Sequence, residues 1–273
     1  MSITVRRVSF QFPDTLDDVL PGRDLVRESY LVAFSFTMPA LEPYLIRTMR
    51  AALPRITDAA LAADVQAFVG QEAQHFQNHR RVNEMVLSQL SQPAAERIRG
   101  ILRDLDADYQ RFTATRSDRF NLAYAEGFEA MTCAMAMTMF EQAAAAPPGE
   151  PALTGEWANL WAWHAAEEIE HRTVAFEAFD HLVGTYWYRA SGSLRAQLHF
   201  QRYIDRLQRE VLADRGAPAR HHLPGWLRNP EGRRRYLRTF RPGYDPGRLT
   251  PNDLIGLVLS MYGPRDDSSP HQE

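Results

Sequence analysis

The run WHAAEEIEHR at residues 163–172 is the stretch of this chain that decides its fold. It places His164, Glu168 and His171 at positions i, i+4 and i+7, which lie along one face of an α-helix. Imidazoles and carboxylates both bind metal ions, and three of them on one helical face need further ligands from neighbouring helices. We therefore expect this run to form one helix of a metal-binding bundle.

A second run with the same chemistry lies upstream. GQEAQH at residues 70–75 places Glu72 and His75 at i and i+3, again on one helical face. Two Glu-x-x-His pairs on separate helices, joined by single glutamates from two other helices, hold two metal ions in the core of a four-helix bundle. The sequence therefore predicts an all-α protein built on such a bundle, with additional helices and a C-terminal extension.

Apolar residues recur with helical spacing along most of the chain. We expect long helices over residues 24–53, 58–90, 94–114, 117–145, 152–188 and 193–214, and short ones near 231–239 and 251–260. Asp58 is placed to cap the second helix, whereas Pro39 and Pro43 predict a kink or a break in the first. No alternating β-strand pattern competes with this assignment.

The chain is expected to form a single domain over residues 1–273. Residues 1–20 are interpreted as an extended N-terminal arm, and PPGEP at 147–151 as a break between helices. Residues 215–273 are rich in glycine, proline and arginine and form the predicted C-terminal extension, of which the last ten residues are expected to be disordered.

Composition excludes several classes of protein. An apolar fraction of 45% allows a sizeable core, and a net charge of −3 argues against a nucleic-acid-binding surface. Cys133 is the only cysteine, so no disulfide forms within the chain. Neither a signal peptide nor an apolar stretch of about 18 residues occurs, so we expect a cytoplasmic protein without a membrane span.

Seven side chains are candidate ligands of two metal ions: Glu42, Glu72, His75, Glu129, His164, Glu168 and His171. Carboxylates can bridge and neutralise two cations, and a mixed set of nitrogen and oxygen donors suits iron or manganese better than the usual zinc sites. Burying four carboxylates without cations would cost more free energy than a bundle can supply. We expect two iron ions, with a manganese–iron pair as the alternative.

Three further residues are candidates for supporting roles. His79, one turn beyond His75, either orients a ligand or is an ordinary helix histidine. Glu126 lies three residues before Glu129 and is its alternative as a ligand, although we favour Glu129. Met135 lies near the face of Glu129 and is a candidate for a substrate channel, with core packing as the other interpretation.

Glu167 and Glu170 neighbour the ligand run but are expected to point off its face. We expect these two carboxylates to form salt bridges with arginines such as Arg172.

Four segments together resemble a known family: MPALEPYLIRTMR, VQAFVGQEAQHFQNHRRVNE, WAWHAAEEIEHRTVAFEAFD and TFRPGYDP. They resemble the predicted metal-dependent hydrolases of the ferritin-like superfamily over most of the chain, which implies a ferritin-like bundle. The ligand pattern is also similar to that of the diiron arylamine N-oxygenases, which implies His164 as a seventh ligand. The sequence departs from the family in having Ala130 after Glu129, where a histidine is usual, and Pro43 after Glu42.

Three functions follow as hypotheses. The first is a non-haem diiron oxygenase or oxidase that activates O2 on a small, largely apolar or aromatic substrate, with electrons from an external donor. The second is a dinuclear metal-dependent hydrolase. The third is a non-catalytic metal-binding protein. The oligomeric state stays open, with a homodimer as one option.

Overall fold

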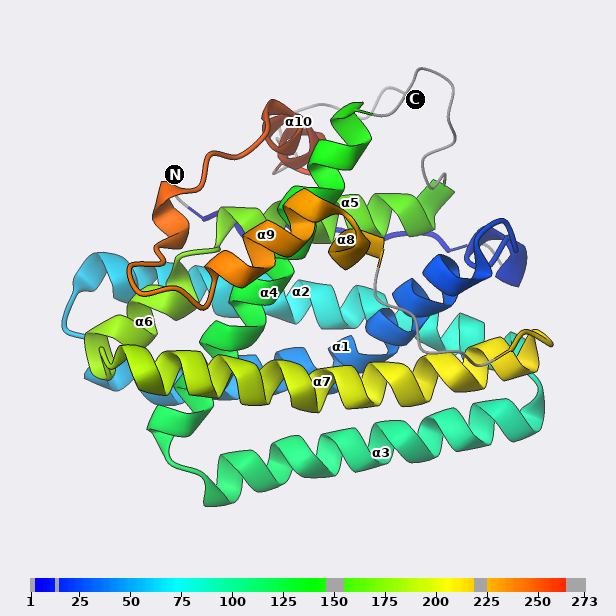
Figure 1. Cartoon of the computed structure of the whole chain (residues 1–273), viewed down its shortest axis with the longest axis horizontal. Helices are drawn as coiled ribbons and strands as arrows, with labels where there is room; N and C mark the ends of the chain where they lie inside the picture. Colours follow the sequence, from blue (N-terminus) through cyan, green and yellow to red (C-terminus); the bar gives the residue numbers. More distant parts are fainter. Residues whose placement is uncertain (1–2, 13–14, 146–154, 219–224, 264–273) are drawn as a thin grey trace, which may run out of the picture.

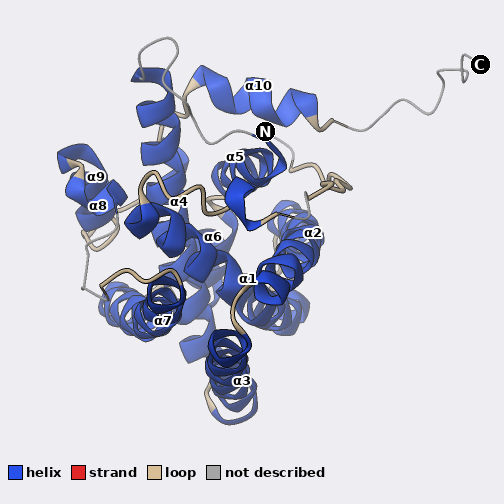
Figure 2. Ribbon diagram, turned by 90° about the vertical axis from the view of Figure 1, so that its right-hand side faces the viewer, coloured by secondary structure: helices blue, strands red, loops and turns tan. Residues whose placement is uncertain are grey.

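The computed structural model describes residues 3–12, 15–145, 155–218 and 225–263 (Figure 1). Within these ranges every regular element is a helix and no strand occurs, which confirms the all-α class (Figure 2). The expected break at PPGEP and the ten C-terminal residues lie outside the described residues.

Six long helices account for most of the described residues. They are α1 (Leu25–Ala52), α2 (Ala59–Gln89), α3 (Gln92–Thr115), α4 (Asp118–Ala145), α5 (Gly155–Glu170) and α7 (Tyr186–Asp214). The shorter elements are α6 (Val174–Leu182), α8 (Gly225–Arg228), α9 (Pro230–Arg238), α10 (Asp253–Met261) and the 3-10 turns η1 (Leu16–Asp18), η2 (Leu53–Arg55) and η3 (Pro246–Arg248). Asp58 caps α2 as expected, accepting hydrogen bonds from the amides of Ala60 and Leu61.

The helices differ in direction. In Figure 1, α1, α2, α3, α5 and α7 run mainly along the long axis of the molecule, and α4 rises steeply across them. Figure 2 agrees, since it shows α3 and α7 almost end-on and α4 lengthwise. Helix α1 packs against α2, α3, α4 and α7, and α5 packs on α4. The ligand-bearing runs therefore face a common interior.

Burial patterns explain these positions. Helix α1 has buried residues on all sides, including Phe34, Met38 and Tyr44, each at most 1% exposed. A helix that is apolar all round belongs in the core. Helix α3, in contrast, buries only one stripe, through residues such as Ile98 and Leu105, and therefore lies at the outside of the molecule.

The two prolines do not interrupt α1, so of the predicted kink or break, the break does not occur. Pro39 has no amide hydrogen to donate to the carbonyl of Ser35, four residues earlier. The side chain of Asn83 in α2 donates to that carbonyl instead, from Nδ2 at 2.8 Å. A partner from the neighbouring helix thus satisfies the acceptor that proline leaves free.

The segment predicted as one helix over 152–188 is instead divided into α5, α6 and the start of α7. At the end of α5, the Arg172 guanidinium donates to the carbonyls of Ile169 at 2.7 Å and Pro246 at 3.0 Å. Gly184 then turns the chain between α6 and α7 with a φ of 60°, which glycine adopts without strain. These boundaries depend on a side-chain cap and a glycine turn, which the spacing of apolar residues does not indicate. The remaining expected helices are present.

No helix in the described ranges has both the length and the apolar character needed to cross a bilayer.

Candidate metal centre

All seven candidate ligands lie in the interior, where α1, α2, α4 and α5 meet. Glu42 comes from α1, Glu72 and His75 from α2, Glu129 from α4, and His164 and Glu168 from α5, with His171 directly after α5. None of the seven is more than 4% exposed. Two pairs of consecutive helices, α1 with α2 and α4 with α5, thus bring these side chains together.

One group of donors surrounds the ring of His171. Its Nε2 lies 3.1 Å from Glu129 Oε2, 3.6 Å from Glu72 Oε1 and 3.7 Å from Glu168 Oε1. Although α5 ends at Glu170, the amide of His171 still donates to the carbonyl of Glu167 at 3.0 Å. The helical stacking predicted from the spacing of Glu168 and His171 therefore persists past the end of the helix.

A second group includes the other two imidazoles. His164 Nε2 lies 3.0 Å from Glu168 Oε1 and 3.8 Å from Glu42 Oε1. His75 Nδ1 lies 3.5 Å from Glu72 Oε1 and 3.9 Å from Glu168 Oε1. The same two oxygens, Glu72 Oε1 and Glu168 Oε1, therefore approach histidines of both groups. This is the arrangement that two neighbouring cations with shared carboxylates require.

Many polar atoms of this cluster have no hydrogen-bond partner. They are Glu42 Oε1 and Oε2, Glu72 Oε1, His75 Nδ1, Glu129 Oε1 and Oε2, Glu168 Oε2 and His171 Nε2. Buried polar atoms are normally hydrogen-bonded, because leaving them without a partner is costly. Three sets of donors in the cluster have ligand atoms within 4.8 Å of one another: Glu42, His75 and His164; Glu72, His75 and Glu168; and Glu72, Glu129 and His171. The donor set therefore fits a pair of metal ions.

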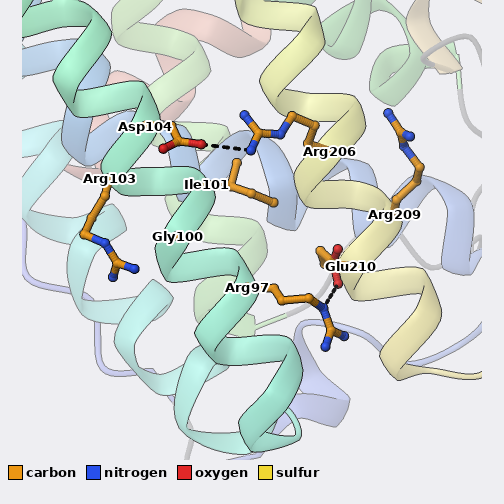
Figure 3. Close-up of a pocket in the computed structure, with 8 residues that line it drawn as sticks. All are labelled: Arg97, Gly100, Ile101, Arg103, Asp104, Arg206, Arg209 and Glu210. Atoms are coloured by element: carbon orange, nitrogen blue, oxygen red, sulfur yellow. Dashed lines mark hydrogen bonds and ion pairs between the residues drawn. The ribbon is translucent and has the colours of Figure 1, made fainter.

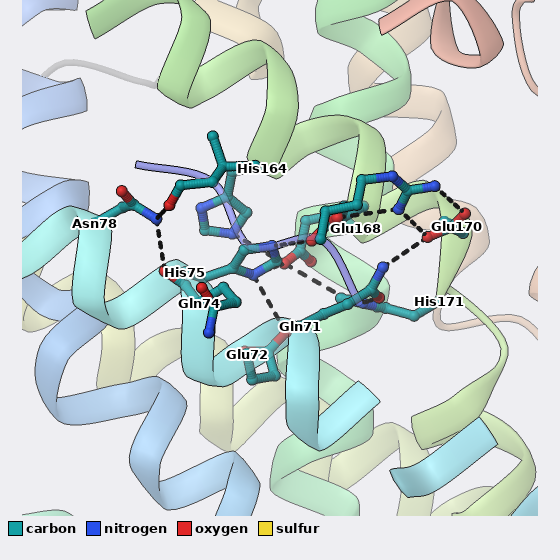
Figure 4. A network of polar contacts seen from close by, with 12 residues as sticks. Gln71, Glu72, Gln74, His75, Asn78, His164, Glu168, Glu170 and His171 are labelled. Carbon is teal, nitrogen blue, oxygen red and sulfur yellow. Dashed lines mark hydrogen bonds and ion pairs between the residues drawn. The ribbon is translucent and has the colours of Figure 1, made fainter. Parts of the chain in front are cut away.

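Two of the histidines are oriented by residues outside the cluster. His171 donates from Nδ1 to Gln71 Oε1 at 2.9 Å (Figure 4), so Nε2 is the ring nitrogen that faces Glu129 Oε2, at 3.1 Å. His75 donates from Nε2 to Glu167 Oε2 at 3.0 Å, which leaves Nδ1 facing the carboxylates. Such outer hydrogen bonds determine which ring nitrogen can bind a metal.

The third histidine is held by a chain of hydrogen bonds through His79. Because Asn83 Oδ1 only accepts, Ser35 donates its hydroxyl there at 2.6 Å and accepts from His79 Nδ1 at 2.8 Å. His79 Nε2 then accepts from His164 Nδ1 at 2.7 Å. Burial, together with the nearby His164 and His75, holds the pKa of His79 well below its usual range, so its ring is neutral. The contacts of His79 are those of a residue that orients a ligand.

Simultaneous ionisation of the four buried acids is unfavourable in the metal-free protein. Burial and the neighbouring acids raise the pKa of Glu72 and of Glu129 to about 8, and raise that of Glu42 as well. Burial acts the same way on Glu168, but the imidazoles of His164 and His171 beside it outweigh burial and hold its pKa well below the usual range. Cations would favour the charged form of all four acids.

Glu126 lies outside this cluster. Arg189 in α7 donates to Glu126 Oε1 at 2.8 Å, and burial raises the pKa of this carboxyl to about 7 despite the opposing charge of Arg189. Of the two alternatives on α4, Glu129 is therefore the one that faces the histidines. Met135 is half-buried, and its role in a substrate channel stays a prediction.

Glu167 and Glu170 form salt bridges, but their partner is Arg6 rather than Arg172. Glu167 is also fully buried and bonds His75, so it takes part in the site, contrary to expectation. The sequence carries no signal for this contact, because Arg6 is 161 residues away from Glu167. Gln71 was missed for a related reason: the atoms it contacts come from α5 and the arm.

Two buried aromatic rings pack against histidines of the cluster. The ring of Trp163 lies 4.8 Å from that of His75, and the ring of Phe68 lies 4.8 Å from that of His171.

The cavity drawn in Figure 3 is an open groove of about 470 Å³ between α3 and α7 whose lining contains none of the seven ligands. Its Arg97 and Arg206 pair with acids of the opposite helix.

Comparison with known proteins identifies the family. The family model described as predicted metal-dependent hydrolase matches residues 4–249, a range that includes every candidate ligand. No curated protein and no solved structure matches the chain. With a family match over most of its length and a buried glutamate–histidine cluster suited to metal ions, this chain belongs to the family of predicted metal-dependent hydrolases.

Proposed function

We propose that this protein holds two metal ions between α1, α2, α4 and α5 and uses them to activate O2 for oxidation of a small, largely apolar or aromatic substrate. The observation that carries the proposal is the sharing of carboxylates. Glu72 Oε1 and Glu168 Oε1 each lie within 4 Å of histidines from both groups. Carboxylates shared by two cations would hold the ions close together. Their negative charge would also offset a change in the charge of the ions.

The donor set favours iron. It combines four carboxylates with three imidazoles, and the only cysteine, Cys133, is not among the candidate ligand groups. Thiolates dominate many structural zinc sites, whereas mixed oxygen and nitrogen sets suit iron and manganese. We infer a diiron centre, with manganese–iron as the alternative.

The protein's own residues would position the ions and keep water away. Gln71, Glu167 and His79 fix the three histidine rings, and the packing of Phe68 and Trp163 against those rings makes the surroundings apolar. A pair of reduced iron ions held by these residues would supply the electrons that make O2 reactive toward an organic substrate. Those electrons would be restored by an external donor, which stays a prediction.

Hydrolysis is the second candidate function, and the family description favours it. Two cations act as Lewis acids in dinuclear hydrolases and stabilise the charge that develops on the substrate oxygen. The same seven residues would hold the ions in either case, so the reaction has to be distinguished by experiment. Metal binding without catalysis is the third outcome.

The test compares two loaded forms of the protein. One form is loaded with iron(II) under nitrogen and then exposed to air. It is expected to consume O2 and, at the same time, to convert members of a panel of aromatic amines and acyl substrates. Protein loaded with zinc is expected to be inactive on esters and amides. Activity of the zinc form without O2 would establish the hydrolase instead, and full metal occupancy without any turnover would leave a metal-binding protein.

A further inference from the structure

The N-terminal arm, defined here as residues 3–12, lies against α2 and α5 beside the metal centre (Figure 1). We propose that Arg6 of this arm is a positioning residue for the ligands of both metal positions, so that docking of the arm sets metal affinity. The inference rests on the proposed metal centre, and it adds to that centre a segment without regular secondary structure.

Arg6 joins two carboxylates of α5. Its Nη1 donates to Glu167 Oε1 at 3.0 Å and to Glu170 Oε2 at 2.7 Å, and its Nη2 donates to Glu170 Oε1 at 2.9 Å. The side chain of Arg6 is 7% exposed, so water screens these contacts little. Charge-assisted, bidentate contacts of this kind fix the geometry of both partners.

The first branch leads to His75. Glu167 uses one oxygen for Arg6 and the other for His75 Nε2, at 3.0 Å, and it is fully buried. Without Arg6, this carboxylate would lose the guanidinium that holds its Oε1 and would be free to rotate. Rotation would alter the hydrogen bond that leaves His75 Nδ1 directed at the metal position shared with Glu42 and His164.

The second branch leads to His171. Gln71 Nε2 donates to Glu170 Oε2 at 2.6 Å (Figure 4). It also donates to the carbonyl of Thr4 at 2.9 Å. Both partners accept, so the amide of Gln71 cannot flip, and its oxygen is left to receive the proton of His171 Nδ1 at 2.9 Å. Two acceptors placed by the arm, the Thr4 carbonyl and the carboxylate that Arg6 holds, thus orient the second histidine.

An independent feature shows that α2 is shaped to receive the arm. A Cβ atom at Gly70 would lie 2.6 Å from Cγ2 of Val5. Glycine inside a helix costs about 1 kcal/mol relative to alanine. Because Gly70 immediately precedes Gln71, close approach of the arm and orientation of the amide occur at the same turn of α2.

The first experiment measures metal affinity directly. Titration of the metal-free full chain with cobalt(II), followed by visible absorption and competition with a chelator, is expected to show two ions bound. Arg6→Gln is expected to weaken binding at both positions by about tenfold or more, the usual size of effects from residues that hold a ligand. Arg7→Gln is the matched control, since Arg7 is exposed, and it should bind as the unchanged protein does.

The second experiment moves the arm without removing a charge. Gly70→Ala should displace Val5 and weaken cobalt(II) binding several-fold, even though alanine favours the helix. Adding Val5→Ala should restore binding to within about twofold, because a steric clash between two residues is relieved by shortening either one. Gly100→Ala in α3 is the control, where an added Cβ meets only Arg103 Nη2 at 3.8 Å.

The outcomes separate the two proposals. If Arg6→Gln and Gly70→Ala bind two ions as tightly as the unchanged protein does, the proposed role of the arm is wrong and the metal centre stays intact. Loss of unfolding free energy in metal-free Arg6→Gln without any change in affinity would also overturn it, because Arg6 would then be only a structural counter-ion. Failure of the unchanged protein to bind cobalt(II) would overturn both.

Discussion

At the scale of single residues, the metal centre depends most on Glu72. One of its oxygens approaches both His75 and His171, so it connects the two groups of donors. Burial keeps this carboxylate out of water, and its Oε1 has no hydrogen-bond partner. A change that preserves its shape but removes its charge therefore tests the centre with little disturbance of packing.

Glu72→Gln is expected to reduce the amount of metal bound per chain and to weaken what remains at least tenfold, because both positions lose a charged ligand. Elemental analysis after reconstitution with iron(II) provides the measurement. Glu84→Gln, an exposed change on the same helix, should leave the metal content unaltered. Equal metal content in the two variants would show that the ligand assignment is wrong.

The titration of the buried acids predicts the pH dependence of the metal-free protein. Burial raises the pKa of Glu72 and Glu129 to about 8, above their ordinary value of 4.5 in an unfolded chain. The folded state therefore binds more protons, and the stability this provides is present at low pH and lost as the pH rises through about 8. Burial lowers the pKa of His171, but the neighbouring carboxylates of Glu129 and Glu168 outweigh burial and raise it, which acts in the same direction.

We expect the free energy of unfolding of the metal-free protein to fall by on the order of 2 kcal/mol between about pH 7 and about pH 9. Urea denaturation at several pH values provides the measurement. Glu72→Gln should show a shallower decline, since one of the titrating groups is removed. A flat or rising profile for the unchanged protein would contradict the assignment of these two carboxyls.

At the scale of elements, α1 shows how a helix with two internal prolines stays continuous in the core. The carbonyl of Ser35 that Pro39 leaves free is bonded by Asn83 of α2. The same amide accepts from the Ser35 hydroxyl, which starts the chain of hydrogen bonds to His79 and His164. The contact between α1 and α2 therefore contributes both to the helix and to the orientation of a ligand.

Asn83→Ala is expected to destabilise the protein by about 2 kcal/mol, because a buried carbonyl loses the donor that replaces the missing amide hydrogen of Pro39. In a Pro39→Ala background the cost should be smaller by about 1 kcal/mol, since the backbone amide at position 39 can then bond the Ser35 carbonyl. Thermal or urea unfolding of the four proteins of this double-mutant cycle measures the difference. Strictly additive effects would show that the proline and the asparagine are independent.

At the scale of the whole molecule, the metal centre connects α1, α2, α4 and α5, whose ligands come from widely separated parts of the chain. Ions that bind only the folded arrangement stabilise it by mass action. In the metal-free protein, burial and mutual repulsion instead raise the pKa of Glu42, Glu72 and Glu129 and so oppose their ionisation. Metal content and global stability should therefore change together.

Removal of metal with a chelator is expected to lower the melting temperature by on the order of 5 °C, as a single ion at a hundredfold excess over its dissociation constant provides about 2.7 kcal/mol. Differential scanning calorimetry of loaded and metal-free protein provides the measurement. Glu72→Gln should show a much smaller difference between the two preparations. An identical melting temperature with and without bound metal would mean that the ions do not connect the four helices.

Helical spacing was sufficient to identify the residues on each ligand face. Glu72 with His75, and His164 with Glu168 and His171, are local patterns, and rotation about one helix places them together whatever the rest of the chain does. Glu42 and Glu129 were found as single acids at suitable positions in helical segments. The continuity of α1 and the division after Glu170 could not be found in this way, because they depend on Asn83 and Arg172.

The amino-acid sequence by itself determined the helical class, the approximate extent of most helices and the set of acids and imidazoles facing one interior. Only the tertiary structure decided which nitrogen of each histidine is free, since that depends on Gln71, Glu167 and His79. It also decided that Arg6 completes the network, through contacts with residues more than 160 positions away. Short-range periodicity can be read along the chain, whereas hydrogen bonds between distant segments exist only once packing has removed water and brought the partners together.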